Sequence, residues 1–220
     1  MDARTVCESV GTASAFLRGL GPLALAGTRV RPEQLSYYAG AFDPLWVESL
    51  YLPVADGLRP GQTVALVDGP DFHREADPAE AARAYGERPR TRVYESLDVR
   101  SDGWWSLATL HLAGMLRRRV ICTAYESQAG DSNLGAHDDA WLGLIVQMRG
   151  TKRWTIWPTR DHPPEDVVMR TGDVMILPQG MTHQVSTPEE PGHSLHLLFA
   201  VTDEPISSAP GPARSAAGAA

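Results

Sequence analysis

From Val120 onward, short stretches of apolar and β-branched residues alternate with turn residues, and no pattern of helix length interrupts them. The turns between the stretches contain Gly, Pro, Asp and Asn, which tight turns favour. Many short strands at close spacing are typical of an antiparallel barrel or jelly roll. The expected strands are VICTAYE (120–126), WLGLIVQM (141–148), RWTIWP (153–158), DVVMR (166–170), DVMILP (173–178), THQVS (182–186) and HSLHLLFAV (193–201).

Residues 1–119 have a mixed pattern, and we expect them to form helices and short strands that pack on the outside of the barrel. The clearest helix is expected over DPAEAARAYG (77–86), with Asp77 as N-cap, Pro78 at the first helical position, Glu80 completing a capping box and Gly86 ending the helix. TRVYESLDVR (91–100) alternates like a strand, and the segment 101–119 has a helical pattern. Residues 120–202 would then be the barrel core, and the small, Pro-rich segment 203–220 a disordered tail.

Composition excludes several classes of protein. A chain of 220 residues is long enough for one domain with a full core. Its formal charge of −7 argues against a nucleic-acid partner, and no apolar stretch approaches the roughly 20 residues that cross a membrane. Two cysteines without a CxxC spacing, together with an N-terminus that lacks a signal-peptide pattern, favour the cytoplasm. The sequence gives no indication of the oligomeric state.

The segment GAHDDAW (135–141) places an imidazole and two carboxylates at the mouth of an expected strand. Side chains at i and i+2 of a strand share a face, so His137 and Asp139 would point together and Asp138 away from them. GDVMILPQGMTHQV (172–185) would bring His183 back to this pair through a hairpin. Two histidines and one carboxylate are the ligands of a non-haem Fe(II) site, so we predict a metal centre here.

Each of these signals is weak alone, because a lone H-x-D motif or a lone histidine occurs often by chance. His193 and His196 are rivals of His183 for the third ligand. We expect His193 to be exposed in the turn PEEPGH, and His196 to lie near the site or in the core. His73, His111 and His162 have no partner pattern and are expected to be structural or exposed.

Lys152 follows the strand 141–148 and a turn that contains Gly150. Alternation places Lys152 on the same strand face as Trp154 and Ile156, which indicates a cavity wall, whereas a solvated turn pair with Arg153 is the alternative. A buried ammonium needs an anion, and the far carboxylate of a dicarboxylate ligand would supply one.

HDDAWLGLIVQMRGTKRWTIWP, followed by GDVMILPQGMTHQV and HSLHLLFAV, resembles the JmjC (cupin-like) family of Fe(II)/2-oxoglutarate-dependent oxygenases over roughly residues 118–202. Within that family it is similar to the ribosomal-oxygenase branch, whose motif is H-x-D, then a strand ending in Gln, then G-x-[KR]-x-W. The positions that match are His137, Asp139, Gln147, Gly150, Lys152 and Trp154.

The resemblance implies a mainly β fold of the α+β type, a double-stranded β-helix with N-terminal helices packed outside. It also implies Fe(II) bound by His137, Asp139 and His183 as the catalytic centre, with 2-oxoglutarate and O2 as cosubstrates. Lys152 would hold the far carboxylate of 2-oxoglutarate, and the further candidates for contacts with this cosubstrate are Thr123, Tyr125 and Ser194.

The expected function is therefore that of a dioxygenase that hydroxylates a C–H bond of a small molecule or peptide and releases succinate and CO2. Two alternatives remain. One is a ribosomal-type protein hydroxylase working with a partner, since the helical dimerisation segment and winged-helix domain of that branch are not expected in this chain, and Leu142 stands where the branch has an acidic residue. The other is a cupin-like metal-binding domain or enzyme that does not use 2-oxoglutarate.

Overall fold

The computed structural model describes residues 3–28, 34–52, 63–100, 103–131, 133–159 and 162–205. The helices in these ranges are α1 (Ala3–Gly27), α2 (Pro44–Ser49), α3 (Pro78–Glu87), α4 (Leu97–Arg100) and α5 (Trp104–Leu116). The strands are β1 (Ser36–Tyr38), β2 (Val64–Asp68), β3 (Asp71–Glu75), β4 (Thr91–Tyr94), β5 (Arg118–Gln128), β6 (Leu142–Trp157), β7 (Glu165–Arg170), β8 (Val174–Leu177), β9 (Thr182–Ser186) and β10 (His193–Pro205).

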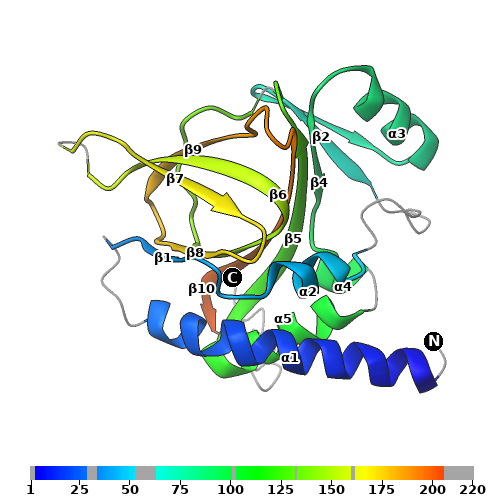
Figure 1. Ribbon diagram of the computed structural model, residues 1–220, viewed down its shortest axis with the longest axis vertical. Coiled ribbons are helices and arrows are strands. Elements are labelled where there is room, and N and C mark those ends of the chain that lie inside the picture. Colours follow the sequence, from blue (N-terminus) through cyan, green and yellow to red (C-terminus); the bar gives the residue numbers. More distant parts are fainter. Residues whose placement is uncertain are drawn as a thin grey trace, which may run out of the picture.

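The antiparallel barrel expected from the strand rhythm is present (Figure 1), and the strands pair in the order β1-β8-β6-β10-β5-β4-β2-β3. The long strand β6 joins two sheets, because its first part pairs with β8 and β10 and its second part with β7 and β9. The sequence analysis expected two separate strands here. A bend at Gly150, with a φ of 66°, and a register shift beside it let one strand pass from the first sheet to the second.

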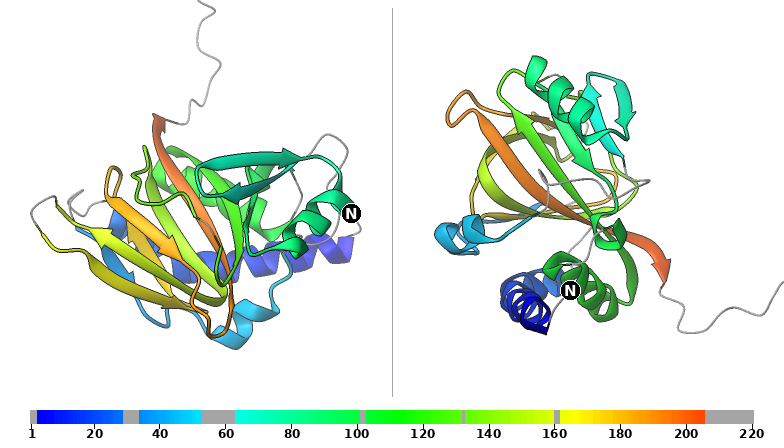
Figure 2. Two further views of the ribbon diagram at one scale, coloured as in Figure 1. Left: turned by 90° about the horizontal axis from the view of Figure 1, so that it is seen from above. Right: turned by 90° about the vertical axis from the view of Figure 1, so that its right-hand side faces the viewer.

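Helices α1 and α5 lie side by side below the barrel (Figure 2) and cover the face of the sheet opposite the barrel interior. Phe16 of α1 is fully buried, and its ring centroid lies 4.8 Å from that of Trp104 and 5.9 Å from that of Phe199 on β10. These aromatic contacts fix the helical layer on the sheet. No helix in the described part of the chain is long and apolar enough to cross a membrane.

The N-terminal half contributes more strands than its sequence pattern suggests. Strand β1 pairs with β8, and β4 pairs with β5 and extends the sheet to β2 and β3. The alternating stretch 91–100 is a strand only to Tyr94 and then turns into α4. At the other end, β10 continues to Pro205, so residues 203–205 are strand and the rest of the expected tail lies outside the described residues.

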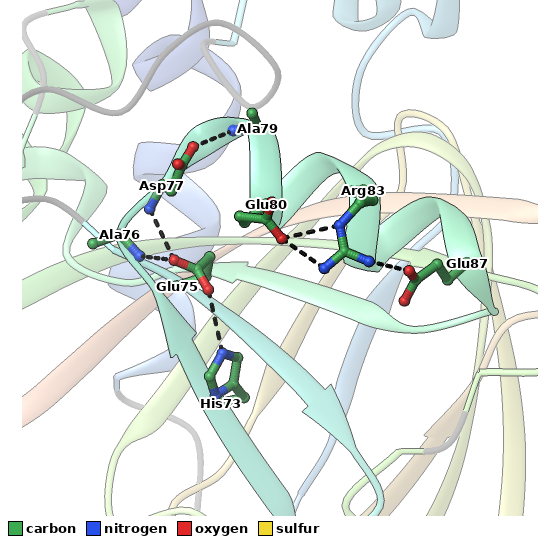
Figure 3. A network of polar contacts seen from close by, with 8 residues as sticks. All are labelled: His73, Glu75, Ala76, Asp77, Ala79, Glu80, Arg83 and Glu87. Carbon is green, nitrogen blue, oxygen red and sulfur yellow. Dashed lines mark hydrogen bonds and ion pairs between the residues drawn. The ribbon is translucent and has the colours of Figure 1, made fainter.

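Helix α3 begins as expected but is capped differently (Figure 3). The Asp77 carboxylate accepts a hydrogen bond from the Ala79 N–H. The Asp77 N–H, which a capping box would pair with Glu80, donates instead to Glu75 at 3.0 Å, while Glu80 binds Arg83. The helix also runs through Gly86 to Glu87, so that glycine does not end it.

Candidate metal centre

His137 and His183 face each other because their backbones pair. The His137 N–H donates to the His183 carbonyl at 2.9 Å, and the His183 N–H donates to the His137 carbonyl at 2.8 Å. The Asp139 carbonyl accepts from the Gly180 N–H at 2.9 Å, so the turn before β9 is attached to the H-x-D segment at a second point. This short antiparallel pairing lies between segments 46 residues apart in the chain, which explains how they share one site.

Both imidazoles are oriented by backbone carbonyls. His137 Nδ1 lies 2.9 Å from the Gly135 oxygen, and His183 Nδ1 lies 3.0 Å from the Met181 oxygen. A carbonyl only accepts, so each Nδ1 carries the proton and each Nε2 keeps a free lone pair. Metal-binding histidines are commonly oriented in this way.

The ligand atoms of His137, Asp139 and His183 all lie within 4.8 Å of one another, and His183 Nε2 is 3.8 Å from Asp139 Oδ2. Asp138, between the first two, is exposed and does not belong to this group. Burial raises the pKa of the Asp139 carboxyl and lowers the pKa of the His183 imidazole. A bound divalent cation would favour the ionised carboxylate and the neutral imidazoles, so two nitrogens and one oxygen form a donor set that suits a borderline metal such as Fe(II).

The group opens into a cavity of about 380 Å³ inside the barrel. Its wall is formed by residues of β2, β4, β5, β6, β8, β9 and β10 and of the β5–β6 connection. Phe72 on β3 and Leu134 on that connection, both exposed in part, also line it. Among the described residues, Trp141 Nε1, Trp154 Nε1 and His196 Nδ1 are buried cavity-wall atoms without a hydrogen-bond partner. Buried polar atoms in proteins are almost always satisfied, so a cavity with several free ones is suited to a polar ligand or ordered water.

Lys152 lies in the wall of the same cavity and is only 1% exposed. In β6, Lys152, Trp154 and Ile156 are buried and Arg153 between them is exposed. This confirms the expected alternation and excludes a solvated turn pair. The Lys152 ammonium donates to Ser127 Oγ at 2.8 Å and to Thr187 Oγ1 at 3.0 Å, and it lies 3.7 Å from Asp131 Oδ2.

Two of the three other residues expected to contact the cosubstrate line the cavity, and one does not. Thr123 and Tyr125 line the cavity from β5. Ser194 does not line it: this fully buried hydroxyl accepts from Gln147 Nε2 at 2.8 Å. His196, a rival for the third metal ligand, lies outside the metal group and stacks on Tyr125 with ring centroids 5.0 Å apart. Burial lowers its pKa to about 3, so His196 is neutral.

Of the remaining histidines, none joins the metal group, and His193 is exposed as expected. The sequence analysis missed Ser127, Thr187 and Asp131 as partners of Lys152. Alternation could have identified the first two, because Ser127 follows Thr123 and Tyr125 at even spacing and Thr187 follows His183. Asp131 comes from a loop and had no such signal.

Comparisons with known proteins agree with this geometry. Residues 100–207 match the family model of the JmjC domain. Ribosomal oxygenase 2 of Rattus norvegicus is 33% identical over 95 residues, which cover 36% of this chain and 20% of that protein. The bifunctional lysine-specific demethylase and histidyl-hydroxylase NO66 of Drosophila persimilis is 33% identical over 96 residues, which cover 36% of this chain and 13% of that protein. The chain therefore spans about a fifth or less of the length of these relatives.

Solved structures show the same fold. The ribosomal oxygenase YcfD of Escherichia coli superposes with a TM-score of 0.57 at 16% identity, over 79% of this chain and 49% of that one. A second structure of YcfD, in complex with cobalt and 2-oxoglutarate, gives a TM-score of 0.54 at 17% identity over the same shares. Together, the family match, the barrel topology and the arrangement of the His-Asp-His group identify residues 100–207 of this chain as a JmjC domain.

Proposed function

We propose that this chain is an Fe(II)- and 2-oxoglutarate-dependent oxygenase that hydroxylates a C–H bond and releases succinate and CO2. One observation carries the proposal: a single cavity contains a His-Asp-His group and, in another part of its wall, a buried lysine. A metal and a cation in one cavity suit a ligand that chelates with one end and carries a carboxylate at the other. YcfD, which shares the fold, has been solved with cobalt and 2-oxoglutarate.

The protein's own residues would bind and orient the reactants. His137, Asp139 and His183 would hold the iron, which when bound supplies the activation of O2, and their arrangement leaves other coordination positions free. Lys152 would bind the far carboxylate of 2-oxoglutarate. Trp141 and Trp154 would shield the reacting atoms from water, because both lie in the cavity wall.

Of the two substrate classes expected, the comparisons favour a polypeptide over a free small molecule, because the relatives are named ribosomal oxygenase and histidyl-hydroxylase. We therefore propose a side chain of a protein or peptide, a ribosomal protein among them, as the group that is oxidised. We also propose that the protein acts in the cytoplasm, since both Cys7 and Cys122 are free thiols.

The test is the effect of Lys152→Met on the affinity for 2-oxoglutarate, measured anaerobically by calorimetry on the Fe(II)-loaded protein. Loss of a charge-assisted hydrogen bond, and burial of an unpaired carboxylate, together cost roughly 1.5 to 5 kcal/mol. The affinity should therefore fall roughly 10- to 4000-fold, since each 1.4 kcal/mol is about tenfold.

Arg153→Met is the matched control, because Arg153 is the adjacent cation on β6 and is exposed. It should leave the affinity for 2-oxoglutarate unchanged, and neither variant should alter Fe(II) binding. An unchanged affinity in Lys152→Met would refute the cosubstrate assignment and favour a cupin-like protein that uses no dicarboxylate. Succinate release, and the gain of one oxygen atom by candidate peptides in mass spectrometry, would then identify the substrate.

A further inference from the structure

The ammonium of Lys152 has hydrogen-bond and ion-pair partners among the protein's own side chains. It donates to the hydroxyls of Ser127 and Thr187, which also bond to each other at 2.7 Å. Its third neighbour is the carboxylate of Asp131, with 3.7 Å between Nζ and Oδ2. The side chains of Lys152 and Asp131 are 2% and 1% exposed, so this ion pair is shielded from water.

Two hydrogen bonds hold Asp131 in place beside Lys152. The hydroxyl of Thr91 donates to Asp131 Oδ2 at 2.5 Å, and this is the same oxygen that faces Lys152. The Asp131 N–H donates to the Gln128 carbonyl at 3.1 Å, which fixes the backbone at the end of β5. Lys152 and Thr91 line the cavity and Asp131 does not, so the carboxylate lies behind them.

The charges at this end of the cavity therefore cancel before any cosubstrate arrives. A dicarboxylate whose far end reached Lys152 would place a second carboxylate beside a single ammonium. Two like charges close together in a buried site repel each other strongly, because the low dielectric of the interior screens them little.

We propose that Asp131 is a built-in counter-ion of Lys152 that competes with the far carboxylate of the cosubstrate and thereby lowers its affinity. The proposal rests on the proposed function, because it assumes that this carboxylate binds at Lys152. Asp131 is then a specificity-determining residue: it weakens the binding of every ligand with an anionic far end and has no effect on ligands without one.

The experiment compares two ligands of the Fe(II)-loaded protein in anaerobic calorimetry. 2-Oxoglutarate carries the far carboxylate, whereas 2-oxobutyrate has the same chelating end and lacks it. In Asp131→Asn, which keeps the size of the side chain and removes its charge, the Kd of 2-oxoglutarate should fall about 10-fold or more. The Kd of 2-oxobutyrate should stay within about twofold of its wild-type value.

Two further variants complete the design. Asp203→Asn removes the same charge from an exposed ion pair with Arg118 far along β10, and should change neither Kd. Thr91→Val keeps every charge but removes the hydrogen bond that holds Asp131 against Lys152, so it should tighten 2-oxoglutarate by a smaller factor. If Asp131→Asn does not fold, Thr91→Val still tests the competition.

An unchanged or weaker affinity of Asp131→Asn for 2-oxoglutarate would overturn the proposal, because Asp131 would then support Lys152 rather than compete for it. An equal change for both ligands would overturn it as well, since Asp131 would act on the whole site. Failure of the proposed function has a different signature: neither the wild-type protein nor Asp131→Asn would bind 2-oxoglutarate more tightly than 2-oxobutyrate.

Discussion

Replacing Gly150 by alanine tests how β6 is bent to place Lys152 in the cavity wall. Gly150 has a φ of 66°, in the left-handed region, and a Cβ built there would collide with the carbonyl oxygen of His193 and lie 2.9 Å from its carbonyl carbon. The left-handed conformation costs an alanine roughly 1 to 2 kcal/mol. The collision is with backbone of β10, which cannot rotate away, and overpacking of this kind adds roughly 1 to 3 kcal/mol.

The free energy of unfolding should therefore fall by roughly 2 to 5 kcal/mol in Gly150→Ala. At roughly 2 to 4 °C per kcal/mol for a chain of this size, the Tm should fall by roughly 4 to 20 °C. Chemical denaturation followed by circular dichroism measures the first quantity and thermal denaturation the second. The affinity for 2-oxoglutarate should fall as well, because Lys152 follows the bend by two residues.

Gly69→Ala is the matched control. Gly69 lies in the turn between β2 and β3 with a φ of 61°, and nothing lies within 4 Å of a Cβ built there. It should lose only the roughly 1 to 2 kcal/mol of the backbone conformation and keep its affinity for 2-oxoglutarate. The reasoning is refuted if Gly150→Ala is no less stable than Gly69→Ala, because the close approach of β6 to His193 would then have no energetic consequence.

The remaining predictions concern the metal and the charge of Lys152. Alanine replacement of any one member of the His-Asp-His group should abolish tight Fe(II) binding in anaerobic calorimetry, whereas Asp138→Ala should retain it. Loss of Fe(II) binding in Asp138→Ala would show that the wrong carboxylate was assigned. Burial lowers the pKa of Lys152 and the nearby Asp131 raises it, with a net decrease to about 8. The affinity for 2-oxoglutarate should therefore be constant below that pH, where the ammonium is charged, and should fall roughly tenfold per pH unit above it. His196, the other titratable group facing Lys152, stays neutral over this range. A profile that stays flat to about pH 9.5 would show that binding does not need the ammonium charge.

Two kinds of pattern explain why so much of the barrel could be predicted from the sequence. Apolar, β-branched stretches bounded by turn residues identified β5, β7, β8, β9, β10 and both parts of β6. Alternation of buried and exposed residues assigned Lys152 to a buried face, because successive side chains of a strand point to opposite sides. The same reasoning placed His137 and Asp139 on one face, and the structure brings both to His183.

Patterns of this kind carry no information about which strands pair. The addition of β1 to β8 and of β4 to β5 depends on contacts between distant segments, and the sequence analysis expected the N-terminal half to lie outside the barrel. Strand β3 gave no signal because its residues are almost all exposed. The bend at Gly150 was read as a turn between two strands, since a glycine in the left-handed region is as typical of a hairpin as of a bulge.

The connection between β5 and β6 links the two ends of the candidate site. It carries Asp131 beside Lys152 and, six residues later, the H-x-D segment beside His183. Both ends make polar contacts with the barrel. Asp131 contacts Thr91 and Lys152, and the backbone of the H-x-D segment bonds to the backbone of His183 on β9. The loop therefore carries both the proposed counter-ion and two of the candidate metal ligands, and hydrogen bonds to rigid neighbours hold its polar groups in place. This explains why the residue that most changes the expected chemistry of Lys152 is one that strand patterns could not identify.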